Sequence, residues 1–249
     1  METNPRGKSV NVSGISAVFP AYNDGGTISS MVLTALMALR QVTEDYEIVV
    51  TDDGSTDYTG QVLDELAKYI PELRVIHHDR NRGYGCALRT GFAAATKEWI
   101  FYTDGDAQYN PLELFDLVSA LTDGVDVVNG YKISRQDPWF RIIIGRVYHH
   151  LVRLTFGIKL RDVDCDFRLM RRNLFDKVTL DSERGTLPVE LVKKFQDCGA
   201  KFIEVPVHHY HRQYGKSQFF NWRRIWLSGK MLISLWKKLV LRKEHLKSD

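Results

Sequence analysis

The chain alternates between short apolar runs and longer segments whose apolar residues recur at helical spacing. The run ISAVFP at residues 15–20 is followed by residues 27–40, in which apolar side chains return every three or four positions. The same order recurs three times, with YEIVVT before QVLDELAKYI, LRVIHH before ALRTGFAAAT, and WIFYT before PLELFDLVSALT. Four consecutive strand–helix units predict an α/β fold with a mostly parallel sheet flanked by helices.

The second half of the chain is less regular. VDVVNG at residues 125–130 reads as another strand, whereas residues 131–163 are basic and aromatic without clear strand alternation. AKFIEVPVHHY at residues 200–210 predicts a late strand, and its internal Pro206 places that strand near an edge of the sheet. A chain of 249 residues with 44% hydrophobic residues is long enough for one large domain or two small ones.

Composition limits where such a protein works. The three cysteines are far apart and form no CxxC pair, which argues against a disulfide framework and a zinc site. The first residues lack the apolar core of a signal peptide, and no apolar run approaches the roughly 18 residues of a membrane span. We therefore expect a cytoplasmic protein that does not cross a bilayer.

Acidic residues follow the predicted strands. Asp24 comes after the first strand, Asp52 and Asp53 after the second, and Asp104 and Asp106 after the fourth. Ligands of open parallel sheets bind at the carboxyl ends of strands. Carboxylates gathered there repel one another unless a cation lies between them, and Mg²⁺ commonly binds through one or two carboxylates plus substrate phosphates. The pattern indicates a divalent metal site, with solvated turn residues as the alternative.

Two motifs have partial similarity to known ligand-binding loops but do not match them. DGDAQYN is not an EF-hand loop, because Tyr109 replaces the required glycine and Phe115 the bidentate glutamate. NRGYGCALRTG at residues 81–91 is a poor dinucleotide fingerprint, since Leu88 stands at its third position and no strand immediately precedes it.

DDGST at residues 52–56 follows its strand as DGDAQ does. A carboxylate only accepts hydrogen bonds, so Asp53 at a base edge would select uracil or guanine over adenine. Helix capping is the alternative for this segment, and both roles are compatible if Asp57 or Thr59 caps the helix while Asp53 faces the ligand.

Six motifs occur in one order over residues 18–218: PAYND, DDGST, NRGYGCALRTG, DGDAQ, DVDCDFRLMRR and HRQYGKSQ. Together they resemble the inverting family-2 glycosyltransferases of the GT-A fold, and most closely the dolichol- or polyprenyl-phosphate sugar synthases. The resemblance implies a catalytic domain over residues 1–218 and a separate tail over residues 219–249. It also implies that the chain binds a UDP- or GDP-sugar donor and a polyprenyl phosphate acceptor.

The resemblance assigns roles residue by residue. On the donor side, nucleotide binding falls to Pro20, Tyr22, Asp24, Asp52, Asp53 and Asp104, and binding of Mg²⁺ or Mn²⁺ to Asp104, Asp106 and Gln108. On the acceptor side, phosphate binding falls to Lys132, Arg135, Arg168, Arg212 and Ser217, because guanidinium forks match phosphate geometry. The expected catalytic set is Asp104, Asp106, Arg168, Arg212 and, in second rank, Glu190.

Several positions depart from the pattern or have a structural explanation. Gly130-Tyr131-Lys132 stands where relatives commonly show Gly-Ser-Arg, so Lys132 or Arg135 would replace that arginine, and Tyr84 stands where a lysine is frequent. For Arg168 the alternative is a surface ion pair with Asp164 or Asp166. We interpret Cys165 and the histidines at positions 208, 209 and 211 as structural residues.

The expected reaction transfers a hexose to a lipid phosphate with inversion at the anomeric carbon, assisted by a metal. A phosphate monoester is already largely ionised near neutral pH, so this acceptor needs little help from a general base. Two alternatives remain at this stage. A sugar hydroxyl acceptor would need a base, for which Glu190 or Asp164 is the candidate, and a nucleotide-sugar-binding module would perform no turnover.

The tail is basic and amphipathic. Residues 219–249 carry eight Lys or Arg against two acids, whereas residues 1–218 carry a net charge of −3. Trp222, Ile225, Trp226, Ile233, Trp236 and Val240 share one helical face, and Gly229 predicts a bend or two half-helices. We expect this helix to lie on an anionic membrane surface; packing on the sheet domain or on a second subunit is the alternative. Nucleic acid is not an expected partner.

Overall fold

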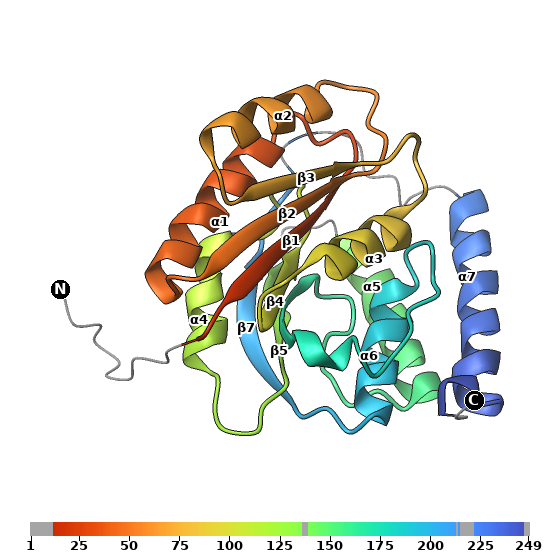
Figure 1. Ribbon diagram of the computed structural model, residues 1–249. Helices are drawn as coiled ribbons and strands as arrows, with labels where there is room; N and C mark the ends of the chain where they lie inside the picture. The colour runs from red at the N-terminus through yellow and green to blue at the C-terminus, as the bar shows by residue number, and fades with distance from the viewer. Residues whose placement is uncertain (1–11, 136–138, 213, 215–221, 247–249) are drawn as a thin grey trace.

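The computed structural model describes residues 12–135, 139–212, 214 and 222–246. Its centre is a seven-stranded sheet with the order β3-β2-β1-β4-β6-β5-β7 (Figure 1). The strands are β1 (Ile15–Ala21), β2 (Tyr46–Asp52), β3 (Leu73–His77), β4 (Trp99–Thr103), β5 (Val127–Arg135), β6 (Phe167–Arg171) and β7 (Phe202–His209). Only β6 runs antiparallel to its neighbours, so the carboxyl ends of the other six strands meet at one edge.

Helices cover both faces of the sheet. They are α1 (Ile28–Val42), α2 (Thr59–Tyr69), α3 (Tyr84–Ala94), α4 (Leu114–Ser119), α5 (Trp139–Phe156), α6 (Leu187–Asp197) and α7 (Trp222–Trp236), with short 3₁₀ turns at Pro111–Glu113, Arg172–Leu174 and Glu244–Leu246. Apolar side chains of α1, α2 and α4 form one core with the sheet, and those of α3, α5, α6 and α7 form the other. Figure 1 shows these two groups on opposite sides of the strands.

The predicted strand–helix units are present, and α3 packs closely on β1. A Cβ atom at Gly91 would lie 2.5 Å from Val18 Cγ1, so only glycine allows this approach. β7 is an edge strand, as Pro206 predicts. The sequence did not reveal α5 or β6, because α5 carries basic side chains between its apolar ones and β6 is a short run inside DVDCDFRLMRR.

The tail forms a helix that belongs partly to the domain core. Leu235 and Leu239 are buried against α5 and α6, and the Trp236 indole donates a 2.9 Å hydrogen bond to the Thr155 carbonyl oxygen. His245 Nε2 lies 2.7 Å from Asp197 at the end of α6. Packing on the sheet domain, which the sequence left as an alternative, is therefore correct for the second half of the tail.

The first half of the tail behaves differently. Trp226 and Ile233 are exposed, whereas Trp236 and Val240 of the same predicted stripe pack on the domain. The helix continues through Gly229 without a break, so the predicted bend there is wrong; the irregular turn is a π-helical segment at Lys237–Leu241. None of the helices in the described part of the chain is both long and apolar enough to span a bilayer.

Candidate active site

The expected donor-side acids meet at the carboxyl edge of the sheet. Asp24 lies in the turn after β1, where its carboxylate accepts a 3.0 Å hydrogen bond from the Tyr22 amide. Asp104 and Asp106 follow β4, and Asp24 Oδ2 is close to the intervening Gly105. Burial, followed by the charge of Asp106, raises the pKa of Asp24 from 3.8 to about 6, although the Tyr22 amide opposes the shift. This part of the protein therefore binds positive charge readily.

The DGDAQ carboxylates show the same effect. Burial raises the pKa of Asp104 well above its usual range, and the charges of Asp166, Asp106 and Asp24 add to the shift. Burial also raises the pKa of Asp106. Tyr84, which stands where a lysine is frequent, donates a 2.7 Å hydrogen bond to Asp104 and supplies no compensating charge. Asp166 is a further site residue that the sequence reading treated only as an ion-pair partner for Arg168.

Arg212 contacts the donor-side acids. Its guanidinium binds the Asp106 carboxylate, and Tyr214 lies over Gly26, in contact range of the loop after β1, with its ring 6.4 Å from that of Tyr58. The segment that carries Arg212 therefore folds over the donor-side acids. Arg212 thus lies beside the donor-side acids, which attract its guanidinium, and its expected contact with the acceptor phosphate stays a prediction.

Arg168 is not available to a phosphate ligand. Its side chain is fully buried, and it donates hydrogen bonds to the Asn129 side chain, the Tyr102 hydroxyl and the Val163 carbonyl oxygen. Its remaining ion pair is with Asp166, at 3.9 Å. The expected direct contact with a lipid phosphate is therefore wrong. Arg168 is instead an internal brace that joins β5, β6 and β4. Its ion pair with Asp166 is one of the two that the sequence analysis gave as the alternative to phosphate binding.

The other acceptor-side residues are only partly assembled. Lys132 Nζ donates a 2.7 Å hydrogen bond to the Asp164 carbonyl oxygen and lies 3.8 Å from the Asp162 carboxylate. Burial raises the pKa of Asp164 to about 7, although the charge of Lys132 opposes the shift. Arg135 ends β5, but its side chain lies outside the described part of the chain, as does Ser217.

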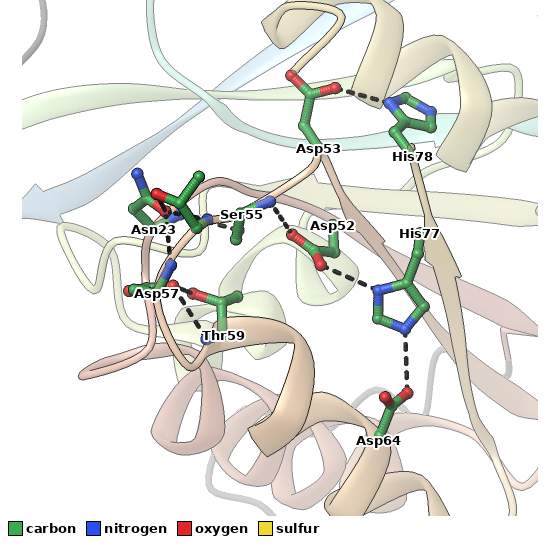
Figure 2. Close-up of polar contacts among 10 residues, drawn as sticks. Asn23, Asp52, Asp53, Ser55, Asp57, Thr59, Asp64, His77 and His78 are labelled. Carbon is green, nitrogen blue, oxygen red and sulfur yellow. Dashed lines mark hydrogen bonds and ion pairs between the residues drawn. The ribbon is translucent and has the colours of Figure 1, made fainter. Parts of the chain in front are cut away.

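DDGST forms a polar network instead of an open base-binding edge (Figure 2). Both Asp53 oxygens are engaged, by His78 Nδ1 at 2.6 Å and by the amides of Arg82 and Gly83 at 2.9 and 2.8 Å. Asp53 is 2% exposed and its carboxylate is bonded within the protein, so the expected contact with a nucleotide base stays a prediction. Its carboxylate positions the loop that precedes α3.

Asp52 and Asp57 complete this network (Figure 2). Asp52 accepts the Ser55 amide at 3.0 Å and binds His77, whose other ring nitrogen lies 3.0 Å from Asp64. Asp52 is thus structural, which corrects its assignment to the nucleotide. Asp57 accepts the Thr59 amide at 2.9 Å, one residue before the N-cap position of α2, which is Tyr58 and makes no side-chain cap.

The remaining donor-side residues line the same region. Pro20 is buried near the end of β1, and Tyr22 is 37% exposed at the strand end. The Gln108 side-chain amide donates to the Tyr210 carbonyl oxygen at 3.2 Å, and the Gln108 backbone amide donates to Asp106 at 3.0 Å. Gln108 therefore links DGDAQ to the segment after β7.

Glu190 is a brace and not a base. It lies in the first turn of α6, is 1% exposed, and pairs with Lys194 at 2.7 Å. It also accepts the amides of Asp181 and Ser182 at 3.0 and 2.7 Å. Burial alone would raise its pKa, but the hydrogen bonds from Lys194 and Ser182 lower it overall. A buried, paired carboxylate with a lowered pKa is a poor proton acceptor, so its catalytic assignment is corrected.

The loop that Glu190 braces supports α3. The Cys86 amide donates to the Glu183 carbonyl oxygen at 3.2 Å, and Arg89 donates to the Asp181 carbonyl oxygen at 3.2 Å. Because α3 begins with Tyr84, which binds Asp104, Glu190 acts on the site through the protein framework. Cys165 is buried, and His208 binds Glu113, in agreement with structural roles for both.

The donor set fits a divalent metal. Two buried carboxylates with raised pKa values, together with an amide residue, are hard oxygen ligands that gain from an added cation. Among the described residues, no three or more His, Cys, Asp or Glu side chains are grouped to hold a metal by themselves. A site completed by substrate phosphates does not need such a group.

Comparison with known proteins agrees with this geometry. One relative, undecaprenyl-phosphate 4-deoxy-4-formamido-L-arabinose transferase of Enterobacter sp. (strain 638), is 33% identical over 207 residues, which make up 82% of this chain and 62% of the relative. The chain thus spans about three fifths of that protein's length.

Solved structures give the fold. Glucosyl-3-phosphoglycerate synthase from Mycobacterium tuberculosis in complex with UDP is 19% identical, with a TM-score of 0.68, and the match covers 91% of this chain and 79% of that one. The same enzyme with Mn²⁺, UDP and glucosyl-3-phosphoglycerate gives a TM-score of 0.67 at 19% identity and the same coverage. The fold is thus that of the GT-A glycosyltransferases. Residues 16–179 match the model described as Glycosyl transferase family 2, and the chain belongs to that family.

Proposed function

We propose that the protein transfers a hexose from a UDP- or GDP-sugar to a polyprenyl phosphate, with inversion at the anomeric carbon. One observation carries the donor half of this proposal. Asp24 and Asp106 are buried and Asp104 is half-buried at the carboxyl edge of the sheet, all three have raised pKa values, and Arg212 binds Asp106. Such a site favours a metal-bound diphosphate over a neutral ligand.

Asp104, Asp106 and Gln108 would hold Mg²⁺ or Mn²⁺. A bound divalent ion neutralises the charge that develops on a departing diphosphate. Arg212 lies on Asp106, where its guanidinium meets incoming donor phosphates, and the exposed Tyr22 ring offers a flat surface to the nucleotide. Asp53 and Glu190 contribute indirectly, by fixing the loop and the helix that carry Tyr84.

The acceptor half is supported by the relative whose name contains undecaprenyl phosphate. An ionised phosphate attacks without a general base. This agrees with the state of Glu190, whose carboxylate is already paired with Lys194. Lys132 and Arg135 at the end of β5 are the remaining candidates for binding that phosphate, together with Ser217. Because the acceptor is held in a bilayer, we place the enzyme at the cytoplasmic membrane face, attached through the exposed side chains of the first half of the tail, such as Trp226 and Ile233.

A sugar hydroxyl acceptor is the second candidate, and Asp164 favours it. A carboxyl group whose pKa is about 7 suits a general base near neutral pH, and Asp164 is beside Lys132 at the acceptor side. The two candidate functions predict different results when Asp164 is substituted. Asp164→Asn should leave transfer to a phosphate acceptor within a few-fold of wild type, but should reduce transfer to a hydroxyl by about 10²–10⁴-fold.

The deciding experiment measures transfer of radiolabelled sugar from UDP- and GDP-sugars, with and without polyprenyl phosphate. We expect a labelled lipid product only when the polyprenyl phosphate and Mg²⁺ or Mn²⁺ are present. Label in a water-soluble glycan would identify the hydroxyl acceptor. Tight nucleotide-sugar binding without any product would identify a binding module that performs no turnover.

Donor and acceptor roles are separated by two substitutions. Arg212→Ala should weaken UDP or GDP binding, because it removes a charge-assisted contact worth about 1.5–3 kcal/mol. Lys132→Ala should instead raise the KM for the lipid phosphate. A normal nucleotide affinity in Arg212→Ala, measured by calorimetry, would return Arg212 to the acceptor side.

A further inference from the structure

Two helices that are far apart in the sequence carry exposed apolar stripes. On α5, Val147, Leu151 and Leu154 are 64%, 55% and 85% exposed. Their spacing of four and three residues puts them on one face of the helix. On α7, Trp226 and Ile233 are 61% and 58% exposed and are separated by two turns, so they also share a face.

The two stripes border the same contact. Trp236 of α7 donates its indole N–H to the Thr155 carbonyl oxygen of α5, so the helices touch there (Figure 1). Thr155 follows Leu151 by four residues, and Trp236 follows Ile233 by three. The buried face of α7, with Leu235 and Leu239, lies on the domain side of this contact. Both stripes therefore lie on its outer side and form one surface, which we call the two-helix plate.

The two helices of the plate contain no acidic residue. Residues 139–156 contain three Arg, two His and no Asp or Glu, and residues 222–241 contain five Lys or Arg and again no acid. Lys230 of α7 and Lys237 at the start of the following π-helical segment are both exposed, and Lys230 Nζ lies 3.5 Å from the Trp226 ring centre. Apolar side chains beside cations, without acids, complement an anionic lipid surface.

The placement of the plate links it to the candidate site. α5 begins four residues after β5 ends, and α7 begins ten residues after Arg212, which binds Asp106. Since β5 ends at the carboxyl edge of the sheet, α5 starts at the edge where the acids lie. α5 therefore begins toward the candidate site, and the Thr155–Trp236 contact lies at its far end.

We propose that the two-helix plate docks on an anionic membrane, with α5 contributing as well as the tail. The proposal rests on the proposed function only for its purpose, which is to bring a lipid-bound acceptor to the site. It commits to a bilayer in place of a second copy of the chain because the exposed face of α7 is cationic, with Lys230 over Trp226, and two such faces would repel each other.

The test uses α5 variants of the full chain, which leave the tail intact. We expect Leu151→Glu/Leu154→Glu to reduce sedimentation with phosphatidylglycerol-containing vesicles at least about tenfold relative to wild type. The matched control is Leu33→Glu/Met37→Glu, which changes two exposed apolar residues of α1 at the other face of the sheet and should bind normally. Circular dichroism verifies folding, and Leu151→Gln/Leu154→Gln replaces the variant if it misfolds.

Three results would overturn the proposal. They are equal vesicle binding by wild type and both α5 variants, wild-type binding that does not depend on anionic lipid, and a wild-type dimer in light scattering that the α5 variant converts to a monomer. Transfer assays separate this proposal from the proposed function. The α5 variant should retain transfer to a short, water-soluble prenyl phosphate and lose transfer to a long-chain acceptor in vesicles. Failure of wild type to transfer sugar to either acceptor would refute the proposed function. Membrane docking would still be decided by the vesicle sedimentation of wild type and the α5 variants.

Discussion

Asp24 gives the sharpest test of the idea that the acids are held in an unfavourable state until a cation binds. The Asp24 carboxylate is 8% exposed and accepts the Tyr22 amide at 3.0 Å, and its pKa is raised from 3.8 to about 6. The largest cause of the rise is burial, and the charge of Asp106 adds to it. In Asp24→Asn the new side chain keeps an oxygen for the Tyr22 amide but has no charge.

The size of the effect follows from the pKa. An acid whose pKa is higher in the folded protein binds more protons there than in the unfolded chain, so stability falls as pH rises. The fall begins near pH 4 and is complete just above pH 6. A rise from 3.8 to about 6 corresponds to about 3 kcal/mol, taking 1.36 kcal/mol for each pKa unit. Asp24→Asn should therefore be up to about 3 kcal/mol more stable than wild type at pH 7, and about equally stable below pH 4.

The assay is urea unfolding of both proteins between pH 4 and pH 8, without metal or nucleotide. Asp123→Asn, which changes an exposed aspartate, serves as the control and should follow wild type at every pH. Adding Mn²⁺ and UDP should stabilise wild type more than Asp24→Asn, because the variant has lost negative charge at the site. A variant that is less stable than wild type at pH 7, or a difference that does not change with pH, would refute the reasoning.

Further substitutions test other contacts. Asp106→Ala should abolish sugar transfer without loss of folded structure, and activity that persists in excess EDTA would contradict the metal assignment. Gly91→Ala should destabilise the protein by about 1–3 kcal/mol, because its Cβ would lie 2.5 Å from Val18, whereas Gly229→Ala, with nothing within 4 Å, should add up to about 1 kcal/mol; thermal melts compare them. Glu190→Ala should cost about 1–3 kcal/mol, because it removes the acceptor of the Asp181 and Ser182 amides and leaves Lys194 with only Thr179 and Asp181, and normal stability in urea would exclude the brace.

The fold was largely predictable because its determinants are local. Apolar alternation and helical spacing identify β1 to β4 and the helices between them, and Pro206 identifies β7 as an edge strand. The sequence did not predict β6 or α5, because the features that determine them are not local or not regular. The five residues of β6 gain their strand conformation from pairing with β4 and β5, which lie far away in the sequence, and α5 carries basic residues between its apolar ones.

The site was predictable in position but not in the division of roles. Strand ends place Asp24, Asp104 and Asp106 together in any parallel sheet, so their convergence needs no knowledge of side-chain contacts. The part played by Asp53 depends on His78 and on the amides of Arg82 and Gly83, about 25 to 30 residues further along the chain. Motif spacing holds no information on whether a strand-end carboxylate meets such donors, and that contact decides whether it binds a ligand or a loop.

The two arginines show how burial separates residues of the same type. A guanidinium has five N–H donors and stays charged, so in the interior it must satisfy those donors with protein acceptors. Arg168 is on β6, a strand with a neighbour on each side, and its donors are taken up by Asn129, Tyr102 and Val163. Arg212 follows the edge strand β7, where the chain leaves the sheet, and its side chain reaches over the strand ends to Asp106. A guanidinium can exchange a carboxylate for a phosphate only from the second kind of position, so we propose that an arginine that binds phosphate in this protein would follow an edge strand and would not lie within a central one.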